Sequence, residues 1–331
     1  MNSSKSLKII PLGGNGQVNK NMFIYEYGEH QIAVDCGIGF PTESMLGVDV
    51  LIPDISYIEK SNKKLHGIVL THGHQDHMGG LPYVLPRLEK DLPIYGSQLT
   101  IALAKNNVQE YGLHNPFKLI KNKIQLGPFS ITPIHVTHSI PDCKHFLIET
   151  PAGTVYHGTD FKFDLTPPDG KPPDLNKIAQ VGSAGIDLLL SDCLRVEKAG
   201  FTQPEKLIKE TFQKELRTTK GKFIVTTMSS SVARFGMAIE AAASAGRKIA
   251  LVGRSVETNL KIAAEEGYVN IPQNMLIDRH KIKNFKNNQV ALMIAGSQGQ
   301  EGSSMQRAAA GEHRNVKLNK GDKVVISSDA I

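Results

Sequence analysis

The sequence predicts an α/β protein built from two differently organised parts. Up to about residue 197, short apolar segments alternate with Gly, Pro or Asn turns, a pattern typical of strands. From about residue 198, strands and helices alternate regularly, which favours a small parallel sheet with helices on both faces. A His- and Asp-rich loop directly follows a buried strand of the first part, and α/β folds place their chemistry in such loops. We therefore divide the chain into 1–197 and 198–331.

The first part contains several segments whose apolar residues suit strands. We expect strands at residues 7–10, 22–27, 31–35, 67–70, 129–136, 145–149, 154–157 and 186–191. Helices are expected over residues 81–90 and 98–111, and a Pro-rich surface loop over 166–174.

The second part is expected to open with a helix that Thr202 caps and that runs to about residue 216. Strands at 222–226, 248–252, 289–295 and 323–327 then alternate with helices at 232–245, 256–266 and 303–310. The 331 residues are enough for two domains with a core each.

Apolar runs and cysteine spacing indicate where in the cell the protein is located. No apolar run approaches the roughly 20 residues that span a bilayer, and the first residues lack the apolar core of a secretory signal. The three cysteines, Cys36, Cys143 and Cys193, are widely spaced and form no CxxC pair. We therefore expect a cytoplasmic protein with reduced thiols and no membrane partner.

Charge is distributed unevenly along the chain. Residues 1–197 carry a net charge of −3, and residues 198–331 carry a net charge of +9. A metal-binding part joined to a basic part suits a polyanionic substrate such as nucleic acid. The alternative is that the excess lysines simply lie on a solvated surface.

The loop THGHQDHMGG, residues 71–80, places four potential metal ligands within six positions: His72, His74, Asp76 and His77. Gly73 lets the backbone turn tightly, so that the two flanking imidazoles can converge on one point. Imidazole and carboxylate ligands without thiolates suit zinc or manganese at a hydrolytic site better than a closed structural zinc site.

Two further candidates follow strands elsewhere in the first part. His138 lies in VTHSIPD and Asp160 in HGTDFKFD. If these strands lie side by side, His72, His74 and His138 would bind one metal, Asp76 and His77 would bind a second, and Asp160 would bridge them. We expect this dinuclear centre.

The motifs together resemble the metallo-β-lactamase superfamily and, within it, the β-CASP ribonucleases of the ribonuclease J type. The resemblance rests on PLGGNG, VDCGIGFPTESMLGVDVLIPD, THGHQDHMGG, THSIPD, GTDFKFD, LLLSDC, GRSVE and GSQGQE, which span essentially the whole chain. It implies an αββα sandwich with an inserted β-CASP α/β domain. It also implies hydrolysis of RNA phosphodiester bonds with two Zn²⁺ ions, or Mn²⁺, as a 5′-3′ exonuclease and an endonuclease in RNA processing.

The resemblance also implies roles for single residues. Asp35 would orient the ligand loop without binding metal itself. Asp192 would help to protonate the leaving oxygen, beside Asp76 and His77 as catalytic groups. RNA would be bound by residues of the basic part at helix starts and by an arginine fork; these are Ser230, Arg234, Gly296, Ser297, Gln298 and Gly299.

The chain departs from the family pattern at several motifs. Gln17 to Asn19, Cys193 to Arg195 and Ala233 stand where the family usually has other residues. These departures keep open a weakly active or non-catalytic paralogue that serves as a subunit of an RNA-decay assembly. A small-molecule hydrolase on the same fold is a second alternative, which the basic β/α part disfavours.

The family would continue beyond Ile331 through a Ser-Gly-His motif that supplies a further metal ligand. We therefore expect the 331-residue chain to bind its second metal weakly, to expose a sheet edge and to have little activity. The resemblance also implies a homodimer or homotetramer through that absent region, or a hetero-oligomer with a paralogue.

Overall fold

The computed structural model describes residues 6–42 and 44–328, and it divides into two compact units. Unit 1 comprises residues up to 138, 142–163 and 173–200, and unit 2 comprises residues 139–141, 164–172 and those from 201 onward. The second unit therefore takes in residues 166–172 of the Pro-rich loop, which precedes the change in sequence pattern. The boundary at 197/198 stays a prediction. The described residues contain no helix that could cross a membrane.

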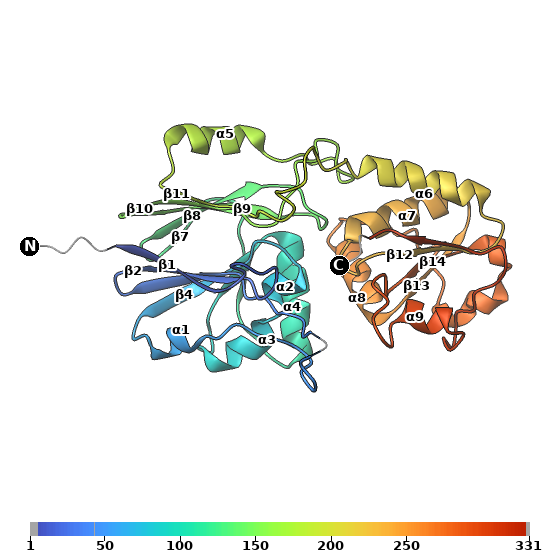
Figure 1. The fold of residues 1–331 in the computed structure, drawn as a ribbon, viewed down its shortest axis with the longest axis horizontal. Coiled ribbons are helices and arrows are strands. Elements are labelled where there is room, and N and C mark those ends of the chain that lie inside the picture. Colours follow the sequence, from blue (N-terminus) through green and yellow to red (C-terminus); the bar gives the residue numbers. More distant parts are fainter. Residues whose placement is uncertain (1–5, 43, 329–331) are drawn as a thin grey trace, which may run out of the picture. The chain divides into compact units, whose positions relative to one another are not determined.

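Unit 1 is a sandwich of two sheets (Figure 1). One sheet has the strand order β1-β2-β3-β4-β5-β6, and the other has the order β11-β10-β9-β8-β7. Side chains from both sheets share one core: Tyr25 and Val69 come from the first sheet, and Phe129 and Phe146 come from the second. Helices α1 to α4 cover the outer face of the first sheet, and α5 lies over the second (Figure 1). This αββα arrangement confirms the predicted fold class.

The strands of unit 1 are β1 (Leu7–Gly13), β2 (Met22–Tyr27), β3 (His30–Val34), β4 (Lys64–Val69), β5 (Ile94–Gly96), β6 (Phe117–Leu119), β7 (Ile124–Leu126), β8 (Phe129–His135), β9 (Lys144–Thr150), β10 (Gly153–His157) and β11 (Leu188–Leu190). Its helices are α1 (Ser56–Lys60), α2 (Gln75–Met78), α3 (Leu81–Val84), α4 (Gln98–Glu110) and α5 (Leu175–Ala184), with a 3₁₀ turn at Leu85–Arg87.

Unit 2 is a parallel sheet with the strand order β13-β14-β12-β15 (Figure 1). Its strands are β12 (Phe223–Thr226), β13 (Lys248–Val252), β14 (Val290–Ile294) and β15 (Lys323–Ile326), and its helices are α6 (Lys206–Thr218), α7 (Val232–Ser244), α8 (Arg254–Glu265) and α9 (Ser304–Ala309), with 3₁₀ turns at Arg279–Asn284 and Asn287–Gln289. The regular β/α alternation in the sequence is therefore confirmed as a parallel sheet.

The helix ends predicted from sequence were wrong in two places. The helix expected over 81–90 stops after Val84 and continues only as a 3₁₀ turn, because Pro86 cannot donate the backbone hydrogen bond that an α-helix needs there. The first helix of unit 2 begins at Lys206 with Glu205 before it, so Thr202 is not its cap. The structure adds α5, over residues for which no element was expected, and this helix buries none of its side chains.

Strand β11 is an edge of the second sheet and, in the part of the chain that the structure describes, pairs only with β10. Its outer residues are apolar and remain exposed, with Leu188 at 42% and Leu189 at 58%. An edge of this kind can accept a further strand.

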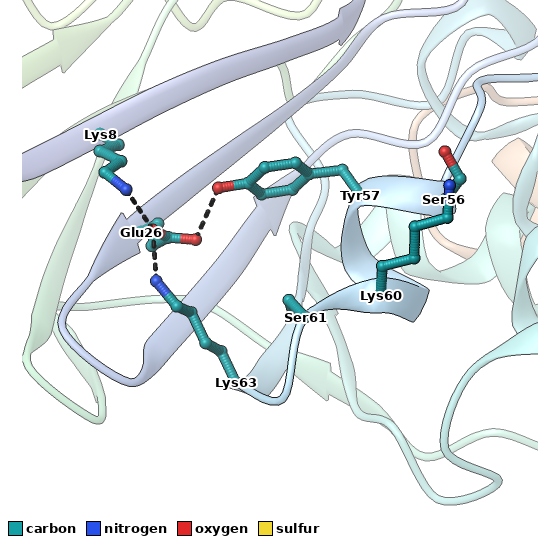
Figure 2. A pocket seen from close by; sticks show the side chains of 7 residues that line it. All are labelled: Lys8, Glu26, Ser56, Tyr57, Lys60, Ser61 and Lys63. Atoms are coloured by element: carbon teal, nitrogen blue, oxygen red, sulfur yellow. Dashed lines mark hydrogen bonds and ion pairs between the residues drawn. The ribbon is translucent and has the colours of Figure 1, made fainter.

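A buried carboxylate, Glu26, ties the first sheet to α1 (Figure 2). It lies on β2 with 2% exposure and accepts hydrogen bonds from Gln31 Nε2 at 2.9 Å and Tyr57 Oη at 2.8 Å. The ammonium groups of Lys63 and Lys8 complete its shell. Burial alone would raise the pKa of Glu26, but these donors outweigh it and lower the pKa to about 2.

We predict that Glu26→Gln destabilises the protein by about 1–3 kcal/mol at neutral pH, because it removes a buried, hydrogen-bonded charge. The folded-state pKa lies below the ordinary value of 4.5, so this stabilisation is present above pH 4.5 and is lost as the pH falls towards 2. Denaturant unfolding across that range measures the difference, with exposed Glu29→Gln as the control. An equal loss of stability at both ends of the range would contradict the assignment.

Candidate metal centre

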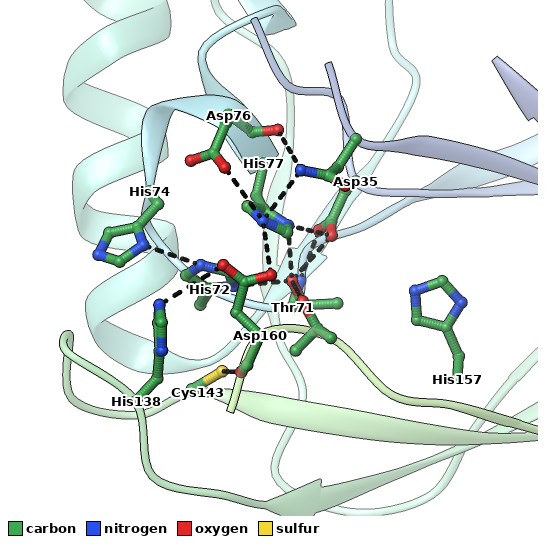
Figure 3. A network of polar contacts seen from close by, with 12 residues as sticks. Asp35, Thr71, His72, His74, Asp76, His77, His138, Cys143, His157 and Asp160 are labelled. Atoms are coloured by element: carbon green, nitrogen blue, oxygen red, sulfur yellow. Dashed lines mark hydrogen bonds and ion pairs between the residues drawn. The ribbon is translucent and has the colours of Figure 1, made fainter. Parts of the chain in front are cut away.

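The predicted ligands come from strand ends in both sheets of unit 1 (Figure 3). In the first sheet, His72 and His74 lie in the loop after β4, and Asp76 and His77 lie on α2. In the second sheet, β8 and β10 both pair antiparallel with β9, so they run in the same direction and end at the same edge. His138 follows β8 and Asp160 follows β10. A backbone hydrogen bond from Lys162 N to Thr137 O, 2.8 Å long, joins these two segments.

One group of donors consists of His72, His74, His138 and Asp160, whose ligand atoms all lie within 4.8 Å of one another. Nε2 of His72 and Nδ1 of His74 are 3.1 Å apart. Nε2 of His138 lies 3.6 Å from Oδ2 of Asp160.

A second group consists of Asp76, His77 and Asp160. Nε2 of His77 lies 3.5 Å from Oδ2 of Asp76 and 3.5 Å from Oδ1 of Asp160. Asp160 belongs to both groups and turns a different oxygen to each. The structure therefore brings all six predicted ligands into two adjoining groups with the predicted membership.

The carboxylate of Asp35 holds the ligand loop in place through hydrogen bonds. It accepts hydrogen bonds from Thr71 N and Thr71 Oγ1, both at 2.8 Å, and Oδ2 lies 2.7 Å from Nδ1 of His77. Since a carboxylate accepts, the Nδ1 of His77 carries a proton, and the Nε2 is the nitrogen that faces the second group. Asp35 reaches this place with φ at +62°, a conformation that Asp and Asn tolerate better than most residues.

The backbone around Asp35 is packed too closely for ordinary side chains. A Cβ on Gly37 would lie 1.5 Å from the carbonyl oxygen of Asp76, so only glycine fits there. The close approach allows Cys36 N to donate to His77 O at 2.7 Å. The strand end that carries Asp35 is thereby tied directly to the helix that carries the second group of donors.

Several supporting residues were missed by the sequence analysis. Asn21 donates from Nδ2 to Asp76 O at 3.1 Å and approaches Nε2 of His77 at 3.1 Å. Thr159 Oγ1 donates to Thr71 Oγ1 at 3.2 Å, and the thiol of Cys143 contacts the Asp160 carbonyl. These contacts join residues far apart in the chain, and no local spacing signals them.

Burial and neighbouring charges shift the pKa values of the histidines in this cluster. Burial, helped by the neighbouring imidazoles, lowers the pKa of His72 and of His74 well below the ordinary value, so both rings are neutral at physiological pH. Burial also lowers the pKa of His77, but the carboxylates of Asp35 and Asp160 outweigh it and raise the pKa well above the ordinary value. The same His77 holds the pKa of Asp160 below its usual range against the effect of burial. The carboxylates therefore favour a positive charge at this point.

The donor set fits a divalent metal. Ligands at about 2.0–2.2 Å from a tetrahedral ion lie about 3.4 Å from each other. The separations of 3.1, 3.5 and 3.6 Å across the two groups are close to this value. Neutral imidazoles and carboxylates without thiolates are ligands that zinc and manganese accept. This cluster could therefore hold divalent metal.

Asp192 lies in the segment after β11 and is half-buried. Its Oδ1 accepts a hydrogen bond from Leu194 N at 2.8 Å. Burial raises the pKa of Asp192, and the negative charge of Asp160 raises it further. Burial likewise raises the pKa of Asp76. Asp192 is outside both donor groups, but it is close enough to Asp160 for their charges to interact.

The predicted RNA contacts lie in unit 2, at the carboxyl ends of β12 and β14. Ser230 precedes α7, and the loop of Gly296, Ser297, Gln298 and Gly299 follows β14. Since β12 and β14 are parallel neighbours, these two segments share one edge of the sheet. The hydroxyl of Ser297 and the amide of Gln298 both contact Sδ of Met228.

Arg234, in the first turn of α7, forms hydrogen bonds with other residues of unit 2. Its Nε and one terminal nitrogen donate to the two oxygens of Glu205 at 3.0 and 3.1 Å. The other terminal nitrogen donates to Ser327 O at 2.8 Å. This geometry favours a structural ion pair for Arg234, and its contact with RNA stays a prediction.

Comparison with known families agrees with the fold and the donor cluster. Residues 30–251 match the sequence model of the β-lactamase superfamily domain, and residues 220–331 match that of the β-CASP domain of ribonuclease J. The first match covers more than half of the chain. The chain therefore belongs to the β-lactamase superfamily, and its second part is of the β-CASP type found in ribonuclease J.

The chain is similar to curated ribonucleases J along its whole length. It is 40% identical to ribonuclease J of Helicobacter pylori, over 100% of this chain and 48% of the relative. It is 39% identical to ribonuclease J of Thermus thermophilus, over 98% of this chain and 58% of the relative. The chain thus spans about half the length of these relatives. A protein of unknown function from Enterococcus faecalis V583 shares the fold, with 14% identity, a TM-score of 0.67 and coverage of 98% of this chain and 88% of that one.

We predict that Asp35→Asn lowers affinity for Zn²⁺ and Mn²⁺ by about 10–100-fold, because the amide no longer fixes the His77 tautomer. Asparagine tolerates the positive φ, so the backbone is preserved. Competition with a chromophoric chelator measures the affinity. Asp54→Asn, which changes an exposed carboxylate at the start of α1, is the matched control. A folded variant with unchanged metal affinity would limit Asp35 to a structural role.

Proposed function

We propose that this chain is the metal-dependent part of a ribonuclease of the ribonuclease J type, which hydrolyses RNA phosphodiester bonds. The observation that carries the proposal is the pair of donor groups that share Asp160, in a chain whose second part matches the β-CASP domain of ribonuclease J. The net charge of +9 on residues 198–331 supports a polyanionic substrate. The relatives named ribonuclease J support RNA as that substrate.

The metals proposed are two Zn²⁺ ions, with Mn²⁺ as the alternative. His72, His74, His138 and Asp160 would hold one, and Asp76, His77 and Asp160 the other. When bound, such ions activate water for attack on phosphorus and neutralise the charge that develops on the phosphoryl oxygens.

The protein's own contribution begins with orientation. Asp35 holds the proton on Nδ1 of His77, which leaves Nε2 available, and Asn21 and Gly37 keep the backbone of Asp76 in place. The raised pKa of Asp192 keeps a proton on that carboxyl to a higher pH than usual, which suits a group that protonates the leaving 3′-oxygen.

RNA binding is assigned to the edge of unit 2 where β12 and β14 end. Backbone N–H groups of the Gly296 to Gly299 loop and the Ser230 hydroxyl suit phosphate and ribose oxygens. The positive φ of Gly296 and Gly299, 113° and 69°, gives this loop a shape that other residues rarely adopt. We further propose both 5′-3′ exonuclease and endonuclease action, a cytoplasmic location and self-association or pairing with a paralogue.

The test measures cleavage of 5′-monophosphorylated and 5′-triphosphorylated RNA by the full product of the gene that encodes this chain. We predict metal-dependent cleavage that falls by more than about 100-fold in Asp160→Asn, since this change affects both donor groups, whereas residues behind a ligand cost 10–100-fold. Asp91→Asn, at an exposed turn, should leave cleavage unchanged. If chelators and Asp160→Asn both leave the cleavage rate intact, the proposed function is wrong.

Arg234→Ala separates two roles for the arginine. If Arg234 binds RNA, its loss weakens RNA affinity and makes the salt dependence of binding less steep. If it only pairs with Glu205, unfolding occurs at lower temperature while the salt slope stays the same. We predict the destabilisation in either case, because the buried Glu205 carboxylate loses its ion pair with Arg234. Unfolding curves and RNA binding at several salt concentrations check both readouts.

A further inference from the structure

A second electropositive site lies in unit 2, at the edge where the strands begin. A cavity of about 720 Å³ opens there between the end of α6, the end of α7 and the segments that lead into β13 and β14. The predicted RNA loops follow the opposite, carboxyl ends of the same strands. The cavity is therefore a separate feature of this unit. Its polar lining consists of Gln213, Arg217, Thr219, Lys220, Ser244, Arg247 and Asn288.

The lining is cationic without an acidic counterpart. Arg217, Lys220 and Arg247 all border the cavity, and no Asp or Glu of the described residues does. The nearest helices do carry acids. Glu210 on α6 is exposed and does not line the cavity, and the other two are paired elsewhere. Glu215 on α6 binds Lys323 at 2.6 Å, and Glu240 on α7 binds Lys209 at 2.7 Å.

Arg247 forms a buried part of the cavity wall. It is only 7% exposed and donates to Gly221 O at 2.7 Å and to Thr219 O at 2.9 Å. Its partners are backbone carbonyls, and within residues 6–42 and 44–328 it has no carboxylate partner. Burial lowers the pKa of its guanidinium, as expected for a cation whose charge is not neutralised. A buried cation without an acid leaves a positive potential at this wall.

Helix ends offer a purely structural explanation for these cations. Both α6 and α7 end at the cavity, and each carries about half a negative charge at its carboxyl end. Two such ends balance about one of the three cations, so a positive excess remains. Arg217 and Lys220 are exposed and form no ion pair in the described part of the chain. They are thus available to a ligand.

We propose that this cavity binds the phosphate group of a nucleotide or of an RNA backbone. Its volume lies within the roughly 300–1,000 Å³ of small-molecule sites. Arginine and lysine supply charge, and Gln213, Ser244 and Asn288 supply hydrogen-bonding groups that suit a phosphate ester. The donor groups for metal lie in unit 1, so this inference does not depend on the proposed function.

The test titrates inorganic phosphate, adenosine 5′-monophosphate and a short oligoadenylate into the metal-free protein by calorimetry. The variant Arg217→Gln/Lys220→Gln removes two exposed cavity cations and leaves the buried Arg247 in place. The control Lys206→Gln/Lys214→Gln removes the same charge from exposed positions of the same helix, outside the cavity lining, and leaves the Lys209–Glu240 pair intact. We expect the cavity variant to lose about tenfold or more in affinity for phosphate esters, and the control to lose much less.

The three probes distinguish the source of the phosphate. Binding of the mononucleotide that the cavity variant loses indicates a nucleotide site. If the variant affects only the oligoadenylate, with a less steep salt dependence, the cavity contacts the RNA backbone. Equal affinities in wild type and cavity variant, or equal losses in the cavity variant and the control, overturn the proposal. A lower unfolding temperature without any change in binding would assign these cations to the helix ends.

Discussion

The carboxylate of Asp35 is the constraint on which the candidate metal centre depends. It ends a strand of the first sheet, accepts from the backbone and hydroxyl of Thr71, and holds the imidazole of His77. These contacts fix the loop after β4 and the start of α2 in one geometry. Because Gly37 allows the backbone of Asp76 to approach so closely, Asp35 and the ligands on α2 belong to one hydrogen-bonded network. The remaining donors then need only the neighbouring sheet to bring His138 and Asp160 to the same place.

Strand direction explains how two sheets assemble one site. In the first sheet, β3 and β4 are parallel, so Asp35 and the His-rich loop lie at one edge. In the second sheet, β8 and β10 flank β9 and point the same way, so their ends carry His138 and Asp160 to a common edge. The apolar core shared by the two sheets holds these edges in register. Strand direction and sheet packing therefore bring the ligand-bearing segments of both sheets to one place.

Unit 2 shows how the same charge can serve different purposes. Arg234 is engaged by Glu205, and Lys222 by Asp322 at 2.9 Å, so part of the excess positive charge holds the unit together. Among the described residues, Arg247 has only backbone carbonyls as partners, and Arg217 and Lys220 extend its charge to the surface. The positive potential is therefore concentrated where the cations have no carboxylate partner in the described part of the chain. A net charge counted from sequence alone does not reveal this difference.

Much of the architecture and of the donor set could be predicted from sequence, because these features depend on local pattern. Apolar periodicity marked most strands of both sheets, and the spacing of His72, His74, Asp76 and His77 identified the ligand loop. The short α3 and the start of α6 were missed because single residues such as Pro86 and Glu205 decide helix ends. Tertiary structure alone decided that Asn21 contacts His77, that Arg234 pairs with Glu205 and that three cations border one cavity. Such contacts join residues that are distant along the chain, and their partners depend on how strands and helices pack, which no local pattern encodes.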